Sequence, residues 1–540
     1  MKQLFTTMML GALLFGGAVN AQRIVDIPNQ PSDPVDIVPF VENDTLADGS
    51  HDLNTIYQLE NGGVYLFQSR LSNPGWPLRL HAKDLENTAL KPFILRFPND
   101  DGSFPGNIRP EGDVELVNLW MTWGEGAPGA NHSWGIFRVS ADSLRISIKD
   151  CIMEKDRGGI PQLRANGTKI FIENTIFRSL GNRKILQGNG RGVDGRNFWI
   201  DSLVVKNSVF HNLQDRVFRS QGATIPHNYI EYDQNTIFNQ MGRHGAFQFG
   251  FGAKTVKITN NIIENPTMFG MTPVFNDEQF QVDNDNKFVF TIDGDQNRVD
   301  SIGTTFTFDN NNIYWTKDVL DYYATNDTVS QIGIFSQEVA RKIGAGIDTA
   351  YFSEVLEFSN VPVRLTPYLI DAYADPASTE MFDLIVEPNS AADAFPDVFG
   401  DYENLYDFQS FDIGYSTESA SFTAATDGGS IGARFGNFGL PVDDVLSMND
   451  GLIETILVYP NPSQGAITFR YQLERMEEVS MTLIDINGRE ITVLDSGMKA
   501  SGSHEVQVDL SKYISDYGVY FATFKSSSKS QTMRLVYINQ

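Results

Sequence analysis

A degenerate repeat of short apolar segments, each marked by an asparagine or aspartate turn, restricts the fold of this chain more than any other feature. Six copies align, at residues 148–153, 172–177, 205–210, 233–238, 258–263 and 308–314, and an earlier one lies at 117–119. The reference positions 150, 174, 207, 235, 260 and 311 are separated by 24, 33, 28, 25 and 51 residues, the last step being close to two turns. A period near 25 residues is typical of a solenoid.

The residue types within the copies indicate strands. Units such as Thr175-Ile176-Phe177 are β-branched and aromatic, which disfavours the helical repeats. An asparagine at a fixed turn tolerates left-handed backbone angles and can bond to its neighbour on the next coil. We therefore predict an all-β fold, a right-handed parallel β-helix with an asparagine column at one corner. Its interior stack is predicted to contain Ile176, Val209, Ile237 and Ile262.

This pattern resembles the pectate-lyase-like β-helix superfamily. Residues 59–66 and 91–95 look like the first coil of that superfamily, and residues 411–439 resemble the closing segment of secreted Bacteroidota β-helix proteins. We place an N-terminal extension at residues 22–50, the β-helix with irregular last coils at 51–440, and an aspartate-containing linker at 441–453.

The C-terminal region predicts a second, smaller domain at residues 454–540. Period-two alternation broken by Asn-Gly and Tyr-Gly turns indicates an antiparallel β-sandwich. Its start carries a motif composed of Tyr459, Pro460, Asn461, Pro462 and Gly465. These residues resemble the type A C-terminal sorting domain of the type IX secretion system of Bacteroidota. The resemblance implies the type IX secretion machinery as a partner, removal of this domain, and surface attachment or release. The alternative is a carbohydrate-binding sandwich.

The N-terminus and the composition fit export. Residues 1–21 predict a signal peptide with Lys2, an apolar run and a small-residue cleavage site ending at Ala21. No segment is long and apolar enough to predict a transmembrane helix. The formal charge of −27 disfavours binding of nucleic acid through a general basic surface. The single cysteine, Cys151, excludes an internal disulfide and a cysteine metal cluster.

A basic column provides the candidate chemistry. Nine residues after three of the turns stand the candidate catalytic residues Arg183, Arg216 and His244. Nearby residues complete a candidate substrate-binding set of Lys184, Arg219, Arg243 and Gln248. By the superfamily resemblance they would line a cleft. Uronate β-elimination needs a cation for the carboxylate and a base for the adjacent proton. In the alternative interpretation, the cations only pair with Asp194, Asp201 or Asp215.

Other signatures leave the chemistry open. The Gly-His-Gly of polygalacturonases has its nearest match in Arg243-His244-Gly245, without an aspartate pair. Chondroitinase-B-like and alginate lyases resemble the chain in coil style, but their site motif is not matched. Oxygen ligands at alternate positions, Asp293, Asp295 and Asn297, make a calcium loop one interpretation and a hairpin turn the other.

The hypothesis from the sequence is an exported β-helix protein that binds or cleaves an extracellular acidic polysaccharide. As an enzyme it would be a uronate polysaccharide lyase. The competing class is a non-catalytic cell-surface adhesin or glycan-binding solenoid. Acid and base groups converging with cations on one sugar position would favour catalysis, and cations alone would favour binding.

Overall fold

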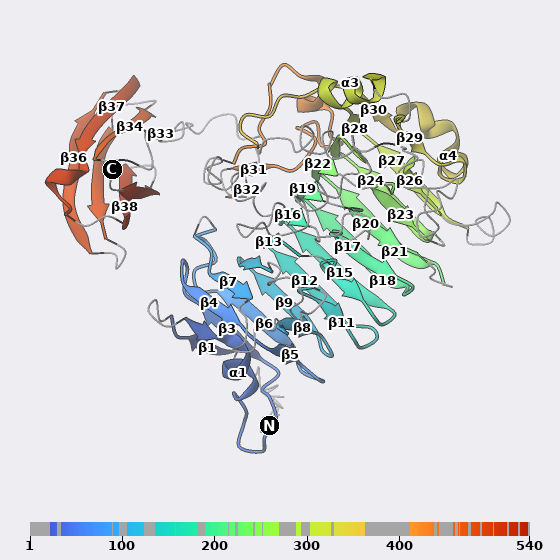
Figure 1. The fold of residues 1–540 in the computed structure, drawn as a ribbon, viewed down its shortest axis with the longest axis horizontal. Coiled ribbons are helices and arrows are strands. Elements are labelled where there is room, and N and C mark those ends of the chain that lie inside the picture. Colours follow the sequence, from blue (N-terminus) through green and yellow to red (C-terminus); the bar gives the residue numbers. More distant parts are fainter. Residues whose placement is uncertain are drawn as a thin grey trace, which may run out of the picture. The chain divides into compact units, whose positions relative to one another are not determined.

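The computed structural model forms two compact units, residues 1–443 and 444–540, which are considered separately (Figure 1). The structure describes residues 22–29, 34–88, 90–96, 105–123, 135–156, 158–180, 190–213, 215–221, 225–240, 244–250, 252–268, 270, 288–292, 303–325, 329–361, 411–436, 440–441, 457–459, 463, 465–473, 477–485, 489–500, 502–515, 518–526 and 530–537.

The first unit is built from three parallel sheets. The first sheet contains β1 (Arg23–Ile27), β3 (Thr55–Leu59), β6 (Leu78–Ala82), β9 (Val114–Val117), β12 (Arg145–Lys149), β15 (Thr168–Glu173), β18 (Ile200–Lys206), β21 (His227–Asp233), β24 (Ala253–Thr259) and β27 (Thr305–Asp309). The second contains β2 (Val35–Asp36), β4 (Val64–Phe67), β7 (Phe93–Arg96), β10 (Trp120–Thr122), β13 (Ile152–Glu154), β16 (Ile176–Leu180), β19 (Val209–Leu213), β22 (Thr236–Gln240), β25 (Ile262–Glu264), β28 (Asn311–Tyr314) and β30 (Tyr351–Phe352).

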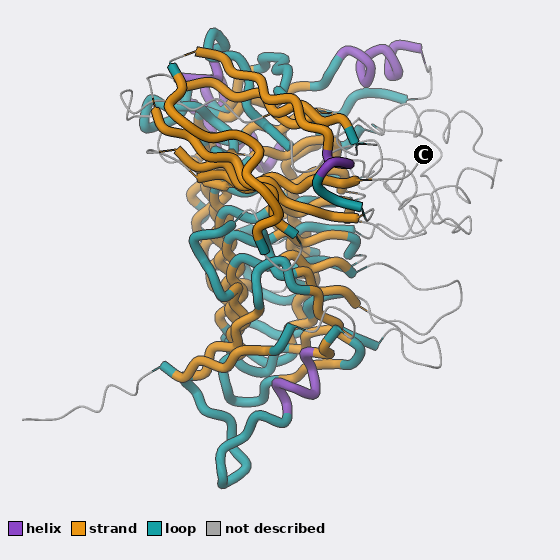
Figure 2. Tube along the Cα trace, turned by 90° about the vertical axis from the view of Figure 1, so that its left-hand side faces the viewer, coloured by secondary structure: helices purple, strands orange, loops and turns teal. Residues whose placement is uncertain are grey.

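The third sheet contains β11 (Arg138–Val139), β14 (Gln162–Leu163), β17 (Val193–Arg196), β20 (Phe218–Ser220), β23 (Phe247–Phe249), β26 (Phe288–Thr291) and β29 (Gly333–Phe335). The pair β5 (Arg70–Ser72) and β8 (Asn107–Arg109) extends it, because Ile108 bridges to Phe137 beside β11. Coil one holds β3, β4 and β5, coil two holds β6, β7 and β8, and the count continues in threes to coil nine. In side view the strands stack as successive rungs (Figure 2).

Alternation of side chains explains why these segments form the strands of a β-helix. In β12, Ile146 and Ile148 are fully buried, whereas Arg145 and Lys149 on either side of them are exposed and Ser147 between them is half-buried. Successive residues of a strand point to opposite faces, so the apolar set of each coil enters the same interior. In the next coil Ile170 continues the row of Ile146. The all-β prediction of a parallel β-helix is confirmed.

The asparagine column exists at the corner between the first and second sheets. Left-handed backbone angles occur at Asn118, Asp150, Asn174, Asn207, Gln234, Asn260 and Asn310. The Nδ2 atom of Asn174 donates to Oδ1 of Asp150 at 3.0 Å, and Asn207 Nδ2 donates to Asn174 Oδ1 at 2.7 Å. The predicted positions 235 and 311 are wrong by one residue. The side chains there belong to a second, buried ladder, in which Asn235 Nδ2 donates to Asn261 Oδ1 at 3.0 Å.

The predicted interior stack is correct only for Ile237. The strand register places Ile237 in the row of Phe210 and Phe177, which packs in the main core. The register places Ile176, Val209 and Ile262 in the neighbouring row, which points outward. These three are buried because other segments cover them: Phe411, Ile413 and Ala433 pack on the cluster of Ile176 and Val209, and Ala425 and Ile431 pack on that of Ile262.

Short helices and the covering segment complete the first unit. The helices are α1 (Ile37–Glu42), α3 (Lys317–Thr325), α4 (Gln337–Ile343), η5 (Gly344–Thr349) and η7 (Ala420–Thr423). The segment 411–436 crosses several coils, since Thr426 bonds to Asn260 and the Arg434 amide bonds to Asn207. It ends in the hairpin β31 (Phe435–Gly436) and β32 (Leu440–Pro441).

The second unit is an antiparallel sandwich, as predicted. One sheet contains β33 (Leu457–Tyr459), β34 (Ala466–Leu473) and β37 (Gly502–Asp509). The other contains β36 (Glu490–Lys499), β35 (Glu477–Ile484), β38 (Gly518–Ser526) and β39 (Ser530–Tyr537), and a short η9 (Leu510–Lys512) follows β37. Phe469, Met481, Leu483, Phe524 and Leu535 form its core.

Candidate functional site

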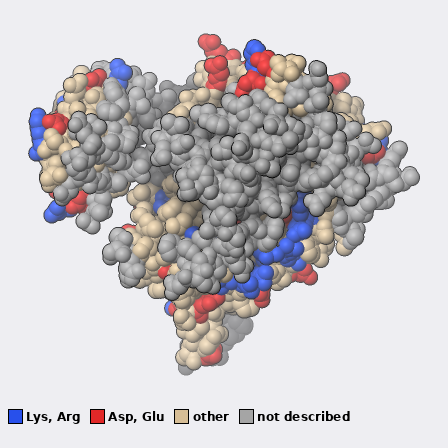
Figure 3. Space-filling model, viewed as in Figure 1, with Lys and Arg blue, Asp and Glu red and all other residues tan. Residues whose placement is uncertain are grey.

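The third sheet carries one arginine on each of five successive coils. This arginine column consists of Arg70, Arg109, Arg138, Arg164 and Arg196. Four of them, Arg70, Arg109, Arg138 and Arg164, adjoin a buried inward-facing position of the short third strand, so period-two alternation places them on the outer face. Arg196 has a left-handed backbone at a register shift, and its charge acts on Arg138 and Arg164. In Figure 3 a band of basic residues crosses this part of the surface, over the region of β5 to β17 in Figure 1.

The strand register fixes the spacing within the column. Arg109 and Arg138 lie side by side because the preceding residues, Ile108 and Phe137, form a bridge. Arg164 and Arg196 each lie two residues beyond the paired Gln162 and Asp194. Neighbouring strands are about 4.8 Å apart, so the five arginines extend about 20 Å along the helix axis.

The arginines of the column are not directly ion-paired in the part of the chain that the structure describes, although the charge of Asp194 acts on Arg164 and Arg196. Among the described residues, none of its five guanidinium groups makes a salt bridge or a side-chain hydrogen bond, and the buried Nε atoms of Arg109 and Arg138 have no partner. Burial, together with the charges of the four other arginines, lowers the pKa of Arg138 to about 10. Burial and the charges of Arg196 and Arg109 lower the pKa of Arg164, while the charge of Asp194 opposes this shift. Such an arrangement of like charges is unfavourable in isolation and becomes favourable when an anion binds.

Beyond the column, on coils five to seven, the charges are paired and buried. The Oδ1 atom of Asp194 accepts a bond from Arg219 Nε at 2.8 Å, and its Oδ2 accepts bonds from Gln162 Nε2 at 3.0 Å and Arg191 Nη1 at 3.3 Å. Burial alone would raise the pKa of Asp194, but Arg191 and Arg219 lower it below its ordinary value. This carboxylate therefore stays ionised and holds two arginines.

Asp215 binds a second group of basic side chains. Its Oδ1 lies 2.8 Å from His244 Nδ1, and its Oδ2 accepts bonds from Arg191 Nε at 2.9 Å and Arg216 Nη1 at 3.2 Å. Despite its burial, the charges of Arg216, His244 and Arg191 hold the pKa of Asp215 well below its ordinary value. Asp215 and Asp194 share Arg191, and the result is one continuous buried network.

The structure brings two of the three predicted catalytic residues together. Arg216 and His244 both contact Asp215, and their side chains are 4% and 15% exposed. This is the pairing that the structural alternative from the sequence describes, and a catalytic role for either residue stays a prediction. Arg183, the third member, lies outside the described residues.

The predicted binding residues are divided in the same way. Arg219 is bonded to Asp194 and its side chain is 12% exposed; burial and neighbouring arginines lower its pKa to about 9. Gln248 lies beside Arg219 in the strand register. The remaining predicted residues fall outside the described part of the chain: Lys184, Arg243, Asp293, Asp295 and Asn297. Within the described part, no group of three or more His, Cys, Asp or Glu side chains could hold a metal ion.

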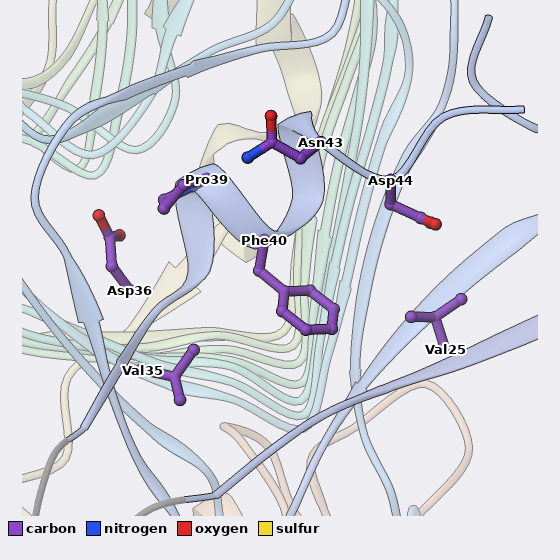
Figure 4. A pocket seen from close by; sticks show the side chains of 7 residues that line it. All are labelled: Val25, Val35, Asp36, Pro39, Phe40, Asn43 and Asp44. Atoms are coloured by element: carbon purple, nitrogen blue, oxygen red, sulfur yellow. The ribbon is translucent and has the colours of Figure 1, made fainter. Parts of the chain in front are cut away.

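A separate hollow lies at the N-terminal end of the β-helix (Figure 4). It is lined by Val25, Val35, Asp36, Pro39, Phe40, Asn43 and Asp44. Asp36 accepts a bond from the Val38 amide and caps α1, while Asp44 binds Arg23 at 2.6 Å. Both carboxylates are thus used for structure, and the hollow is a poorer candidate site than the arginine column.

Comparison with known proteins identifies the second unit. Residues 457–539 match the family described as the secretion system C-terminal sorting domain. The chain is therefore a parallel β-helix protein exported by type IX secretion, to the cell surface or the medium. Neither a search of curated proteins nor one of solved structures returned a match. Of the predicted sorting motif, Tyr459 ends β33 and Gly465 precedes β34; Pro460, Asn461 and Pro462 lie outside the described residues.

In the described part of the chain, no helix is long and apolar enough to cross a membrane.

Proposed function

We propose that the β-helix binds an acidic polysaccharide outside the cell along the arginine column. The observation that carries this proposal is the presence, on five successive coils, of five arginines that make no salt bridge to any described residue. A protein with a formal charge of −27 would gain stability by pairing these arginines with its own carboxylates, as it does for Arg191 and Arg219. A column that keeps them unpaired is suited to an external anion.

Local charge outweighs total charge at such a site. Exposed charges farther away than about 8–10 Å are largely screened at physiological salt, so the field at the column is that of the arginines. A guanidinium group presents a planar fork of donors that matches a carboxylate or a sulfate ester. A polymer offers several such groups in sequence, and extracellular polysaccharides are the acidic polymers that an exported protein meets.

The lyase hypothesis assigns chemistry to the adjoining network. Asp215 orients the imidazole of His244 through Nδ1, and proton abstraction would have to use Nε2. The non-catalytic hypothesis is favoured by the column itself, which consists of arginine and contributes neither an acid nor a base at neutral pH. Binding is common to both hypotheses, and turnover distinguishes them.

The test uses the full chain and a panel of acidic and neutral polysaccharides, with binding measured at low and high salt. The double variant Arg109→Ala/Arg138→Ala should bind acidic polysaccharides at least about tenfold more weakly, and with a shallower salt dependence. The matched control is Arg145→Ala/Lys169→Ala, which removes two register-paired cations from the first sheet. Equal losses in the two variants, or binding of neutral glycans only, would contradict the proposal.

The same samples distinguish enzyme from adhesin. Ultraviolet absorbance of unsaturated sugar products reports β-elimination directly. A lyase should lose turnover in His244→Ala while retaining most of its binding, because a neutral imidazole contributes little charge to the ground state. Binding without any increase in absorbance across the panel would support the adhesin.

A further inference from the structure

We infer that the ligand of the arginine column is a linear polymer with an acidic group on each successive sugar unit, lying obliquely across coils one to five. The inference rests on the proposed function, since it specifies what the same site binds. It follows from the positions of the arginines in the strand register.

The first step concerns adjacent pairs. Arg109 and Arg138 occupy matching positions on neighbouring strands, about 4.8 Å apart in the backbone ladder. Arg164 and Arg196 follow the paired Gln162 and Asp194 by two residues, and the charge of Arg196 acts on Arg164. The backbone and not a mobile loop sets the spacing of Arg109 and Arg138, so this pair favours acidic groups that are equally close.

The second step concerns the path between the pairs. Arg70 pairs in register with Asn107, two residues before Arg109, and Arg164 lies two residues beyond Gln162, the register partner of Arg138. The steps from Arg70 to Arg109 and from Arg138 to Arg164 therefore each combine one strand spacing with an advance of two residues along the strand. The backbone distance covered by each step is about 8 Å. The column therefore crosses the strands obliquely. Each of coils one to five carries one arginine of the column. A ligand with an acidic group on only every second sugar would therefore leave some of these arginines without an anionic partner.

The third step concerns the end of the column. On coil six the register places Ser220 beside Arg196, so no arginine continues the column there. The arginine of that strand, Arg219, lies beside Asp194, which binds it at 2.8 Å. Within the described residues the unpaired column thus ends at Arg196. A ligand that has covered five arginines meets no further unpaired arginine among the described residues of this sheet.

Two measurements on the full chain test the inference. The first is titration calorimetry with a length series of oligogalacturonides, which carry a carboxylate on every sugar. Affinity should rise with length until about five sugars and then level off, because the column offers five cations. Affinity that continues to rise steadily well beyond this length would overturn the inference.

The second compares oligogalacturonides with hyaluronan fragments, which carry one carboxylate per disaccharide, at equal numbers of carboxylates. The closely spaced ligand should bind at least about tenfold more tightly. Equal affinity would show that only the number of charges matters and would overturn the inference while leaving the proposed function intact. Failure of both ligands to bind, with other acidic polymers also inactive, would remove the proposed function itself.

A pair of double variants separates spacing from charge. Arg109→Ala/Arg164→Ala leaves arginines on every second coil, whereas Arg70→Ala/Arg196→Ala removes the same charge and leaves three successive coils occupied. The preference for oligogalacturonide over hyaluronan should collapse in the first variant and persist in the second. An equal decrease in both would contradict the inference. Thermal unfolding checks that the outward-facing substitutions leave the fold intact.

Discussion

Asp215→Asn is the substitution that most directly tests the buried charge network. The Asp215 carboxylate is fully buried and holds Arg191, Arg216 and His244 at 2.9, 3.2 and 2.8 Å. The amide has nearly the same shape but carries no charge, and one of its two polar atoms donates instead of accepting. Arg191 would then share the charge of Asp194 with Arg219, and Arg216 would lose its ion pair with Asp215.

The size of the effect follows from this geometry. Removing one partner of a buried ion pair costs about 3–5 kcal/mol, because the remaining charge is left uncompensated in a medium of low dielectric. We expect Asp215→Asn to lower the free energy of unfolding by that amount. Equilibrium urea unfolding followed by tryptophan fluorescence measures it. Asp321→Asn is the matched control, since Asp321 forms an exposed pair with Lys317 and should contribute little.

The pH dependence provides an independent check. The pKa of Asp215 is lower in the folded chain than in the unfolded chain, so its stabilising contribution is fully present above about pH 4 and is lost as the pH falls through the folded pKa. The difference between wild type and Asp215→Asn should therefore shrink in acid. A loss of less than about 1 kcal/mol at neutral pH, or a difference that grows in acid, would refute the reasoning.

Three further predictions concern the ladder, the core and processing. Lys91 donates to Asn118 Oδ1 at 2.7 Å and to the Asp150 carbonyl at 2.6 Å, and burial lowers its pKa to about 8. Between about pH 8 and 10 the unfolded chain keeps the Lys91 proton that the folded chain has lost, so the free energy of unfolding should rise with pH. Urea unfolding should show this rise in the wild type and not in Lys91→Met. Ile237→Ala should cost about 2–5 kcal/mol in the same assay through the cavity left in the core, whereas the exposed Ile225→Ala should be nearly neutral. Mass spectrometry of the exported protein should show loss of residues 1–21 and of most of residues 454–540, and an intact C-terminus would contradict the processing prediction.

The fold could be predicted because its signals are local. Alternation such as Ile146-Ser147-Ile148 and the recurring turn residue both lie within single coils. The one-residue errors arose where two polar residues adjoin, as at Gln234-Asn235 and Asn310-Asn311, because either residue suits a turn. Only the backbone register decides which of them adopts the left-handed conformation.

The inward and outward rows of the second sheet could not be separated from the sequence. Ile176 and Val209 are as apolar as core residues because Phe411 and Ala433 cover them, more than 200 residues later in the chain. Strands that are buried on both faces show no alternation of apolar and polar residues, so the sequence does not indicate which residues face the interior. That covering contact is a property of the tertiary structure.

The arginine column was missed for a related reason. Its members are 39, 29, 26 and 32 residues apart, and two of them precede the coils in which the repeat is clear. The available signal was an arginine next to an isolated apolar residue in the third strand of each coil, as in Arg70-Leu71 and Leu163-Arg164. Arg216 and His244 were noticed because each follows a predicted turn position, 207 or 235, by nine residues. On the coil of His244 the turn residue is Gln234, so this spacing is not exact, but both side chains contact the same carboxylate, Asp215.

The most direct test of the central claim is the affinity of the full chain for a polyuronate when all five arginines of the column are replaced by glutamine. The side chains point outward, so circular dichroism and thermal unfolding should match those of the wild type. We expect this variant to lose measurable binding at physiological salt, while Arg145→Gln/Lys169→Gln on the first sheet binds as the wild type does. A folded variant that retains both the affinity and its salt dependence would contradict the claim that the column is the binding site.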